Sequence, residues 1–371
     1  NDRAAALAAL EKATAKQPTQ PMLDFLRGKI HEQGGDLAAA RTNYGKALAK
    51  DARFRQAVDS LAALDLAQMD FASARKRYEA LLKLEPKSAS VVMALADVNL
   101  RGGERPAQVN ALIDKSVQTD PVDVSNWLAA LQLQRSLGDP VATLARAQAA
   151  NTALPENPLI LRQLATAQLA QGDHQQAIAN LRRLQQLQPR AAEVHLQLAL
   201  TLGASGKLDA ARAPLATALE LAPDSQAVVQ AAMAMALQDV QPERALKLAR
   251  DVQRRRPAEP TGWLLEADFE MNRGQKAAAA AAYRQALSKQ ESPQTAVLLH
   301  RALLAQDTSL AQQFSVRRLQ EHPKDALFLV HLAEQAQLQG RWPEAEARYR
   351  QALQIVPDDA PVQNNLANAL L

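Results

Sequence analysis

The sequence of 371 residues contains no cysteine and few aromatic residues, which make up 4% of it. Without cysteine there are no disulfides, no thiolate metal sites and no cysteine nucleophile. No apolar run approaches the roughly 20 residues that a helix needs to span a bilayer. The chain also lacks strong charge of one sign, because 43 Lys and Arg face 39 Asp and Glu. We therefore expect no transmembrane segment and no nucleic-acid partner.

Patterns that carry chemistry are missing as well. Neither a phosphate-binding G-x-x-x-x-G-K-[ST] loop nor a G-x-S-x-G nucleophile elbow occurs. Histidines are scattered, with none in an H-E-x-x-H pair or at metal-ligand spacing, and we interpret them as solvated helix residues. These histidines are His31, His174, His195, His300, His322 and His331. We expect no catalytic, cofactor-binding or metal-binding residue, and no cofactor.

Two charged clusters have a structural and a functional interpretation. Asp358-Asp359 follows Pro357 and suits the start of a helix, where carboxylates favour the helix dipole, although a catalytic carboxylate pair stays open. Arg254, Arg255 and Arg256 end a helical segment before Pro257, where positive charge is favourable. Binding of an anionic partner by these arginines is the alternative.

What the sequence does contain is a repeat. Pro189, Pro223 and Pro257 stand 34 residues apart, and each ends a helical pattern that begins again after it. The unit that closes at Pro223 has an apolar helix, a turn at Gly206 and Lys207, and a second, alanine-rich helix. Extended along the chain, this period predicts ten helix-turn-helix units. A lone second helix precedes them at Arg3–Lys16, and a lone first helix follows them from Pro361 to Leu371.

Two departures from the period are visible. The unit that closes at Pro121 is one residue longer than the others, and we place the extra residue in the turn from Gly102 to Pro106, where it disturbs packing least. Between Pro257 and Pro323 two residues are missing, and we place that loss at the junction around Glu291 to Gln294.

Small residues recur where the two helices of a unit would cross. One unit has Ala199 and Ala211 at the crossing and Ala218 late in the second helix, and the unit with Ala333 and Ala345 adds Trp342 and Tyr349. This pattern, with its period, resembles the tetratricopeptide repeat (TPR) family. The resemblance implies an all-α fold, a right-handed superhelical α-solenoid. We expect residues 1–371 to form one continuous TPR solenoid, a slice of a longer repeat protein.

The family binds partners in a concave groove lined by the first helix of each unit, which implies a row of lining positions here. Several of them are apolar, so they either line a ligand groove or belong to the core, and the sequence leaves both open. The partner-binding candidates are Phe25, Lys29, Met93, Asp97, Leu128, Gln132, Arg162, Leu196, Leu264, Asp268, Val330 and Glu334.

A narrower resemblance concerns the amino-acid composition of the repeats. Alanine-, glutamine- and leucine-rich units such as QLATAQLAQGDHQQAIANLRRLQQLQP are similar to those of the TPR lipoproteins that accompany exosortase, PEP-CTERM sorting and exopolysaccharide export. This similarity implies a non-enzymatic scaffold for protein or peptide partners. It also implies a periplasmic location and a lipid anchor upstream of Asn1, and a cytoplasmic location stays open.

Two other functions stay open. The chain could be the substrate-recognition arm of a larger enzyme whose catalytic domain lies outside residues 1–371. Direct polysaccharide binding is the third hypothesis and the weakest, since sugars are usually stacked on exposed aromatic rings and the chain has only three Trp and four Tyr.

Overall fold

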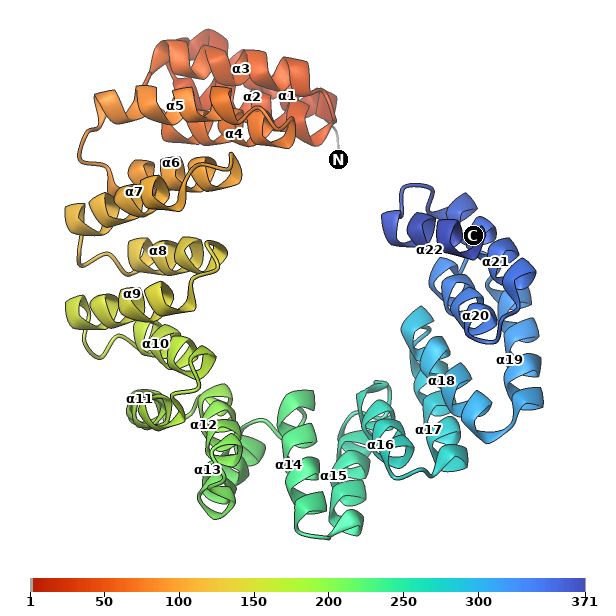
Figure 1. Ribbon diagram of the computed structural model, residues 1–371. Coiled ribbons are helices and arrows are strands. Elements are labelled where there is room, and N and C mark those ends of the chain that lie inside the picture. Colours follow the sequence, from red (N-terminus) through yellow and green to blue (C-terminus); the bar gives the residue numbers. More distant parts are fainter. Residues whose placement is uncertain (1–2, 371) are drawn as a thin grey trace. The chain divides into compact units, whose positions relative to one another are not determined.

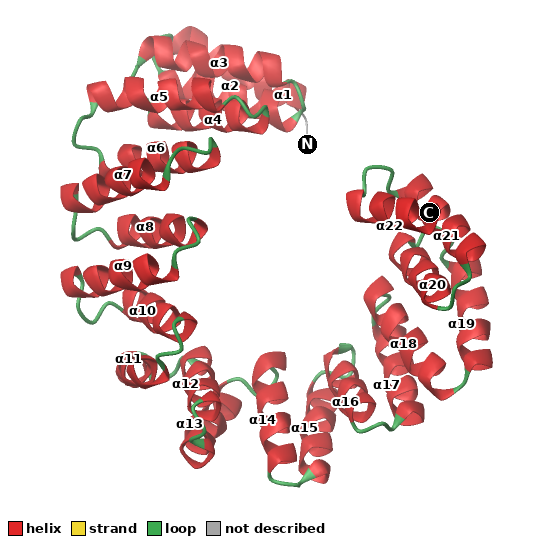
Figure 2. Cartoon of the chain, viewed as in Figure 1, coloured by secondary structure: helices red, strands yellow, loops and turns green. Residues whose placement is uncertain are grey.

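The computed structural model describes residues 3–370, and within them the regular structure is entirely α-helical (Figures 1 and 2). The predicted all-α repeat fold is thereby confirmed. The chain divides into two compact units, Asn1–Pro189 and Arg190–Leu371. None of the helices in residues 3–370 combines the length and the apolarity that a membrane span requires.

The first unit holds α1 to α11. Their bounds are α1 (Arg3–Lys16), α2 (Pro21–Gln33), α3 (Leu37–Lys50), α4 (Arg55–Ala67), α5 (Phe71–Leu84), α6 (Ala89–Arg101), α7 (Pro106–Thr119), α8 (Val124–Ser136), α9 (Pro140–Ala153), α10 (Pro158–Ala170) and α11 (His174–Leu187). After the lone α1, each even-numbered helix packs against the odd-numbered helix that follows it.

The second unit holds α12 to α22. Their bounds are α12 (Ala192–Ala204), α13 (Leu208–Leu221), α14 (Gln226–Gln238), α15 (Pro242–Arg255), α16 (Thr261–Asn272), α17 (Lys276–Lys289), α18 (Pro293–Gln306), α19 (Thr308–Glu321), α20 (Ala326–Leu338), α21 (Trp342–Ile355) and α22 (Ala360–Leu370). Leu371 lies outside the described residues. Residues 3–370 thus contain the ten predicted helix pairs, α2/α3 to α20/α21, between a single helix before them and one after. We call the first helix of each pair helix A and the second helix B.

Turns between helix A and helix B share one backbone conformation. Most are three residues long, and the middle residue has the positive φ that glycine adopts at little cost. Several end on an aspartate, such as Asp36 or Asp173, whose side chain accepts a hydrogen bond from the first turn of helix B. The glycines at the middle position are Gly35, Gly103, Gly138, Gly172, Gly206, Gly274 and Gly340. Met69 and Val240 adopt the same conformation without being glycine.

Val240 is the most strained of these turn residues. Its φ is +56°, its side chain is 85% exposed, and a β-branched residue is disfavoured in this conformation. Replacing Val240 by glycine should therefore raise the free energy of unfolding by about 1 kcal/mol. Chemical denaturation of the full chain measures the change. Val122→Gly is the control, because Val122 is similarly exposed without a positive φ and its replacement should give no gain. A less stable Val240→Gly variant would show that the turn is unstrained.

The predicted crossing residues are buried, as the repeat requires. Ala199, Ala211 and Ala218 are buried in one pair, and Ala333 and Ala345 in another. Gly28 in α2 gives the clearest reason for small size. A β-carbon added there would lie 2.4 Å from the ring of Tyr44 in α3, closer than atoms can approach. Small residues at the crossing therefore set how closely the two helices of a pair approach.

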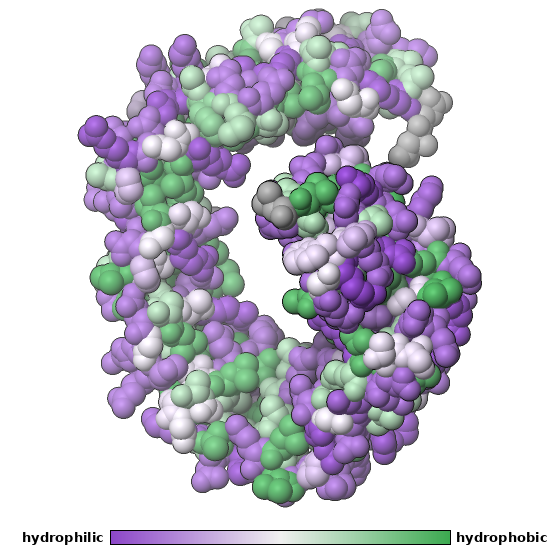
Figure 3. All heavy atoms as spheres, turned by 45° about the vertical axis from the view of Figure 1, so that its right-hand side comes forward, coloured by the Kyte–Doolittle hydropathy of each residue, from purple (hydrophilic) through white to green (hydrophobic). Residues whose placement is uncertain are grey.

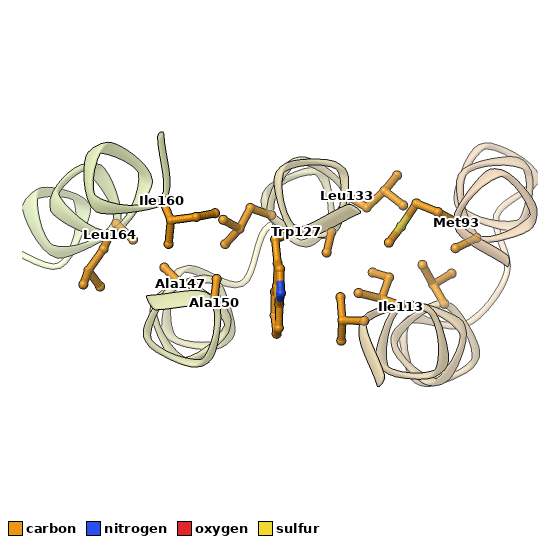
Figure 4. Packing of buried hydrophobic residues seen from close by; sticks show 14 residues of the cluster. Met93, Ile113, Trp127, Leu133, Ala147, Ala150, Ile160 and Leu164 are labelled. Atoms are coloured by element: carbon orange, nitrogen blue, oxygen red, sulfur yellow. The ribbon is translucent and has the colours of Figure 1, made fainter. Parts of the chain in front are cut away.

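Figure 4 shows how a large residue fills the space between neighbouring pairs. Trp127 of α8 lies between Ile113 of α7 on one side and Ala147 and Ala150 of α9 on the other. Its indole nitrogen donates a hydrogen bond to the carbonyl oxygen of Pro121 at 2.8 Å. The core of the first unit is thus continuous along these helices, with small residues in α9 making room for the indole.

The extra residue lies where we predicted it, because residues 102–105 between α6 and α7 make a turn of four residues. The predicted site of the two-residue loss needs correction. Only one residue is lost at the junction of α17 and α18, which shortens to residues 290–292. The other is lost between α18 and α19, where Asp307 alone separates the helices and its carboxylate caps α19 by accepting from Ser309 N. Nine of the ten turns between helix A and helix B in residues 3–370 contain a left-handed residue, and the turn between α18 and α19 contains none.

Candidate protein-binding face

The helices A expose a common side to solvent. Residues at the second, sixth, ninth and thirteenth positions of a helix lie on one side of it, because these spacings follow the helical period. We call this side the helix A face. Apolar residues occupy it in both units, and Leu200 is 56% and Leu338 79% exposed. The others are Met22, Leu26, Leu159 and Leu327. On the side of the molecule seen in Figure 3, hydrophobic residues form separate patches among hydrophilic ones.

Candidates at the fifth position of a helix A point between neighbouring helices. Met93 is buried in the core, at 6% exposure. Phe25 is half-buried, with its ring 5.6 Å from the rings of both Tyr44 and Phe54. The remaining candidates of this kind are also half-buried: Leu128, Arg162, Leu196 and Val330, and so is Leu264 at the fourth position of the shorter α16. The core interpretation therefore holds for Met93, and each of the others exposes only part of its side chain to a partner.

Candidates at the ninth position reach further into solvent. Gln132 is exposed, and Lys29, Asp97 and Glu334 are half-buried, as is Asp268 at the eighth position of α16. Three of the charged members, Lys29, Asp97 and Asp268, have partners within the chain. Lys29 lies 2.9 Å from Glu32, and Asp97 lies 3.0 Å from Arg101. The helix A face thus presents few unpaired charges at these positions.

Two cavities between neighbouring helices A bring several candidates together. One, of about 370 Å³ between α6 and α8, is lined by Met93, Asp97 and Gln132. The other, of about 380 Å³ between α14 and α16, is lined by Asp268 with Leu237. Such hollows between adjacent helices are suited to single side chains of a bound segment.

All four tyrosines of the chain lie on a helix B and bond a side chain of a helix A. Each is the eighth residue of a helix B, and each donates its hydroxyl to an acceptor on the helix A of its own pair. Tyr283 bonds Asp268 at 2.5 Å and Tyr78 bonds Asp59 at 3.0 Å. Tyr44 pairs with Glu32 and Tyr349 with Gln337. Burial raises the pKa of all four hydroxyls, so they remain donors at neutral pH and hold these acceptors in place.

The interpretation of the histidines as solvated was wrong for three of them. His195, His300 and His331 are all buried. Nδ1 of His300 lies 2.9 Å from Nε2 of His331, and burial lowers the pKa of each ring to about 4. The sequence did hold one signal, since 31 residues is close to one repeat and places the two rings on neighbouring helices A.

Asp359 caps a helix as we expected, whereas the arginine run has ion pairs that the sequence did not predict. Arg255 and Arg256 pair with Asp224, at 2.5 and 3.1 Å, and Arg254 pairs with Asp251. Hydrogen bonds from these arginines, with that of Arg255 the strongest influence, hold the pKa of the Asp224 carboxyl below its usual value. Asp359 caps α22 by accepting from Val362 N at 3.1 Å. The arginine run thus ties helix B to the preceding linker.

Comparison with solved structures finds similar chains at low sequence identity. The crystal structure of yeast Tom70 is 12% identical, covering 98% of this chain and 90% of that chain, with a TM-score of 0.49. A tetratricopeptide repeat protein from Parabacteroides merdae is 13% identical, covering 77% of this chain and 100% of that chain, with a TM-score of 0.43. No curated protein matches the chain.

Family models give the assignment. One tetratricopeptide repeat model matches residues 168–236, and a second matches residues 1–57, 60–124 and 235–296. Together these matches cover more than half of the sequence, and they fall on the helix pairs described above. The chain belongs to the tetratricopeptide repeat family.

Proposed function

We propose that this chain is a non-enzymatic scaffold that binds segments of partner proteins along its helix A face. The observation that carries the proposal is the set of solvent-exposed apolar side chains on the helix A face of α2, α10, α12 and α20. Cavities between α6 and α8 and between α14 and α16 add hollows beside other helices A. Exposed apolar residues that repeat in register favour a protein surface as their partner over water. Tetratricopeptide repeats are built to present such a surface.

The chemistry of the face suggests what kind of segment fits. Charges such as Lys29 and Asp97 are already paired within the chain, so a partner gains little by supplying opposite charges. Leu159, Leu200 and Leu338 offer apolar contact instead. A segment with apolar side chains spaced to meet successive helices A would bury them, and its polar groups would remain in water.

We also propose the cellular setting that the style of the repeats implies, namely an envelope secretion or exopolysaccharide export system of PEP-CTERM type, with the scaffold in the periplasm. The alanine-, glutamine- and leucine-rich units support it. The open reading frame upstream of Asn1 tests this directly. A lipoprotein signal with its cysteine would support the setting, and a cytoplasmic start would contradict it.

Substitutions on the helix A face test the scaffold itself. Leu159→Arg and Leu200→Arg, made separately, should each lower recovery of partners from a host extract at least about tenfold, because a buried unpaired charge costs more than 1.4 kcal/mol. Recovery is measured by quantitative mass spectrometry after affinity capture, with circular dichroism confirming an unchanged helix content.

Leu187→Arg and Leu221→Arg are matched controls. Leu187 is 40% and Leu221 39% exposed, against 49% for Leu159 and 56% for Leu200, and both controls lie at the end of a helix B. Partner recovery should stay within about twofold of the wild type. Equal losses in the control and test variants would mean that partners do not select the helix A face.

A further inference from the structure

A cavity behind the shortened turn of the second unit is separate from the helix A face. Its volume is about 290 Å³, and it lies between α18, α19, α20 and the start of α21. Leu304 and Thr308, on either side of Asp307, both line it. The cavity thus occurs at the one helix pair of residues 3–370 whose turn has no left-handed residue.

One wall of the cavity is apolar. Leu304 and Leu319 face Leu332 across it, and all three pack against the core of this part of the unit. Val316 also lines the cavity although its side chain is 55% exposed. A ligand with an apolar body would cover this surface and remove it from water.

His300 brings a buried polar group to the same cavity. The residue is 4% exposed and lines the cavity, and its Nδ1 is occupied by Nε2 of His331. Nδ1 of His331, which does not line the cavity, is buried without a hydrogen-bond partner in residues 3–370. Since burial keeps the pKa of both rings near 4, the pair is uncharged at neutral pH.

The charge of the cavity is then set by its rim. Arg341 lies beside Glu344 and forms an ion pair with it, so these two charges offset each other. Arg348 lines the cavity and bonds only the amide of Gln351, at 3.3 Å, with no carboxylate partner in residues 3–370. Gln312, Gln335 and Gln339 add uncharged donors. The lining therefore carries one uncompensated positive charge beside an apolar wall.

We propose that this cavity binds a small monocarboxylate with an apolar body. The carboxylate pairs with Arg348, and the body lies against Leu304, Leu319 and Leu332. A guanidinium is suited to this role because it presents several donors in the plane of a carboxylate. The single free charge and the nearby Glu344 disfavour dicarboxylates. The site does not depend on partner binding at the helix A face.

Titration with 3-phenylpropionate tests the proposal on the full chain. We expect saturable shifts of the His300 and His331 imidazole signals in ¹⁵N-histidine spectra, with the two rings identified from the spectrum of a His300→Gln variant. The uncharged 3-phenylpropionamide, which keeps the apolar body, should bind at least about tenfold more weakly. Absence of saturable shifts at millimolar 3-phenylpropionate would overturn the proposal, as would equal binding of acid and amide.

Two arginine variants separate the site from general charge effects. Arg348→Gln should weaken 3-phenylpropionate binding at least about tenfold. Arg350→Gln is the control, because Arg350 is exposed, pairs with Glu346 and does not line the cavity. Its affinity should stay within about twofold of the wild type. Equal weakening in both variants, or none in Arg348→Gln, would show that the carboxylate does not pair with Arg348.

Discussion

Replacing Arg318 by methionine is expected to destabilise the second unit by about 3–5 kcal/mol, because breaking a buried ion pair leaves an uncompensated charge. Arg318 is 3% exposed, and its guanidinium bonds Asp325 at 2.5 and 3.0 Å and also pairs with Glu291. Asp325 is buried too, and it caps α20 by accepting from Phe328 N. Loss of the guanidinium therefore strands a carboxylate inside the protein. Chemical denaturation of the full chain measures the effect.

The neighbouring arginine supplies the control for this prediction. Arg317 is exposed, and Arg317→Met should change stability by less than about 0.5 kcal/mol, as is usual at the surface. The double variant Arg318→Met, Asp325→Asn removes both charges and keeps a capping oxygen. It should be more stable than Arg318→Met alone. If the double variant lost as much as two independent changes, the pair would not be coupled.

Trp127→Ala should destabilise the first unit by a similar amount, about 3–5 kcal/mol, which is the usual cost of truncating a buried aromatic residue. The indole is 5% exposed, fills the space between α7 and α9, and donates to the Pro121 carbonyl. The side chains of α9 that face the indole are alanines. They are too small to fill the space that the substitution leaves. A large cavity should therefore remain.

Amide hydrogen exchange measures this loss where it occurs. Repeat arrays are stabilised by nearest-neighbour contacts, so protection should fall most in α7, α8 and α9 and much less in the second unit. Trp342→Ala is the matched control, because Trp342 is 47% exposed and should cost under about 1 kcal/mol. Loss of protection spread evenly over the chain would contradict a local role for Trp127.

The parts of the fold that the sequence predicts are those the repeat constrains many times. Helix pairing, the glycine turns and the buried crossing alanines recur along the chain. The structure expected for one unit can therefore be expected for the next. Ala199 and Ala211 could be placed because any larger side chain would push two helices apart. The extra residue near Gly102 was found in the same way, as a deviation from a known spacing.

Features that occur once were harder to predict. Asp307 replaces a whole turn by ending one helix and capping the next, and only the backbone shows that the loss is divided between two places. Burial of His300 and His331 depends on which side of a helix faces the neighbouring pair, and the irregular spacing obscures that side. For the same reason the fifth-position candidates, such as Met93, could not be told from core residues.

The central claim, that partners bind the helix A face, is tested most directly by site-specific photo-crosslinking in cells. A photoreactive amino acid is placed at Leu159 or Leu200 on the helix A face, and at Leu187 or Leu221 on helices B. Crosslinked partner should form at the first two positions and at least about tenfold less at the second two. Equal crosslinking at all four positions, or crosslinking confined to helices B, would contradict the claim.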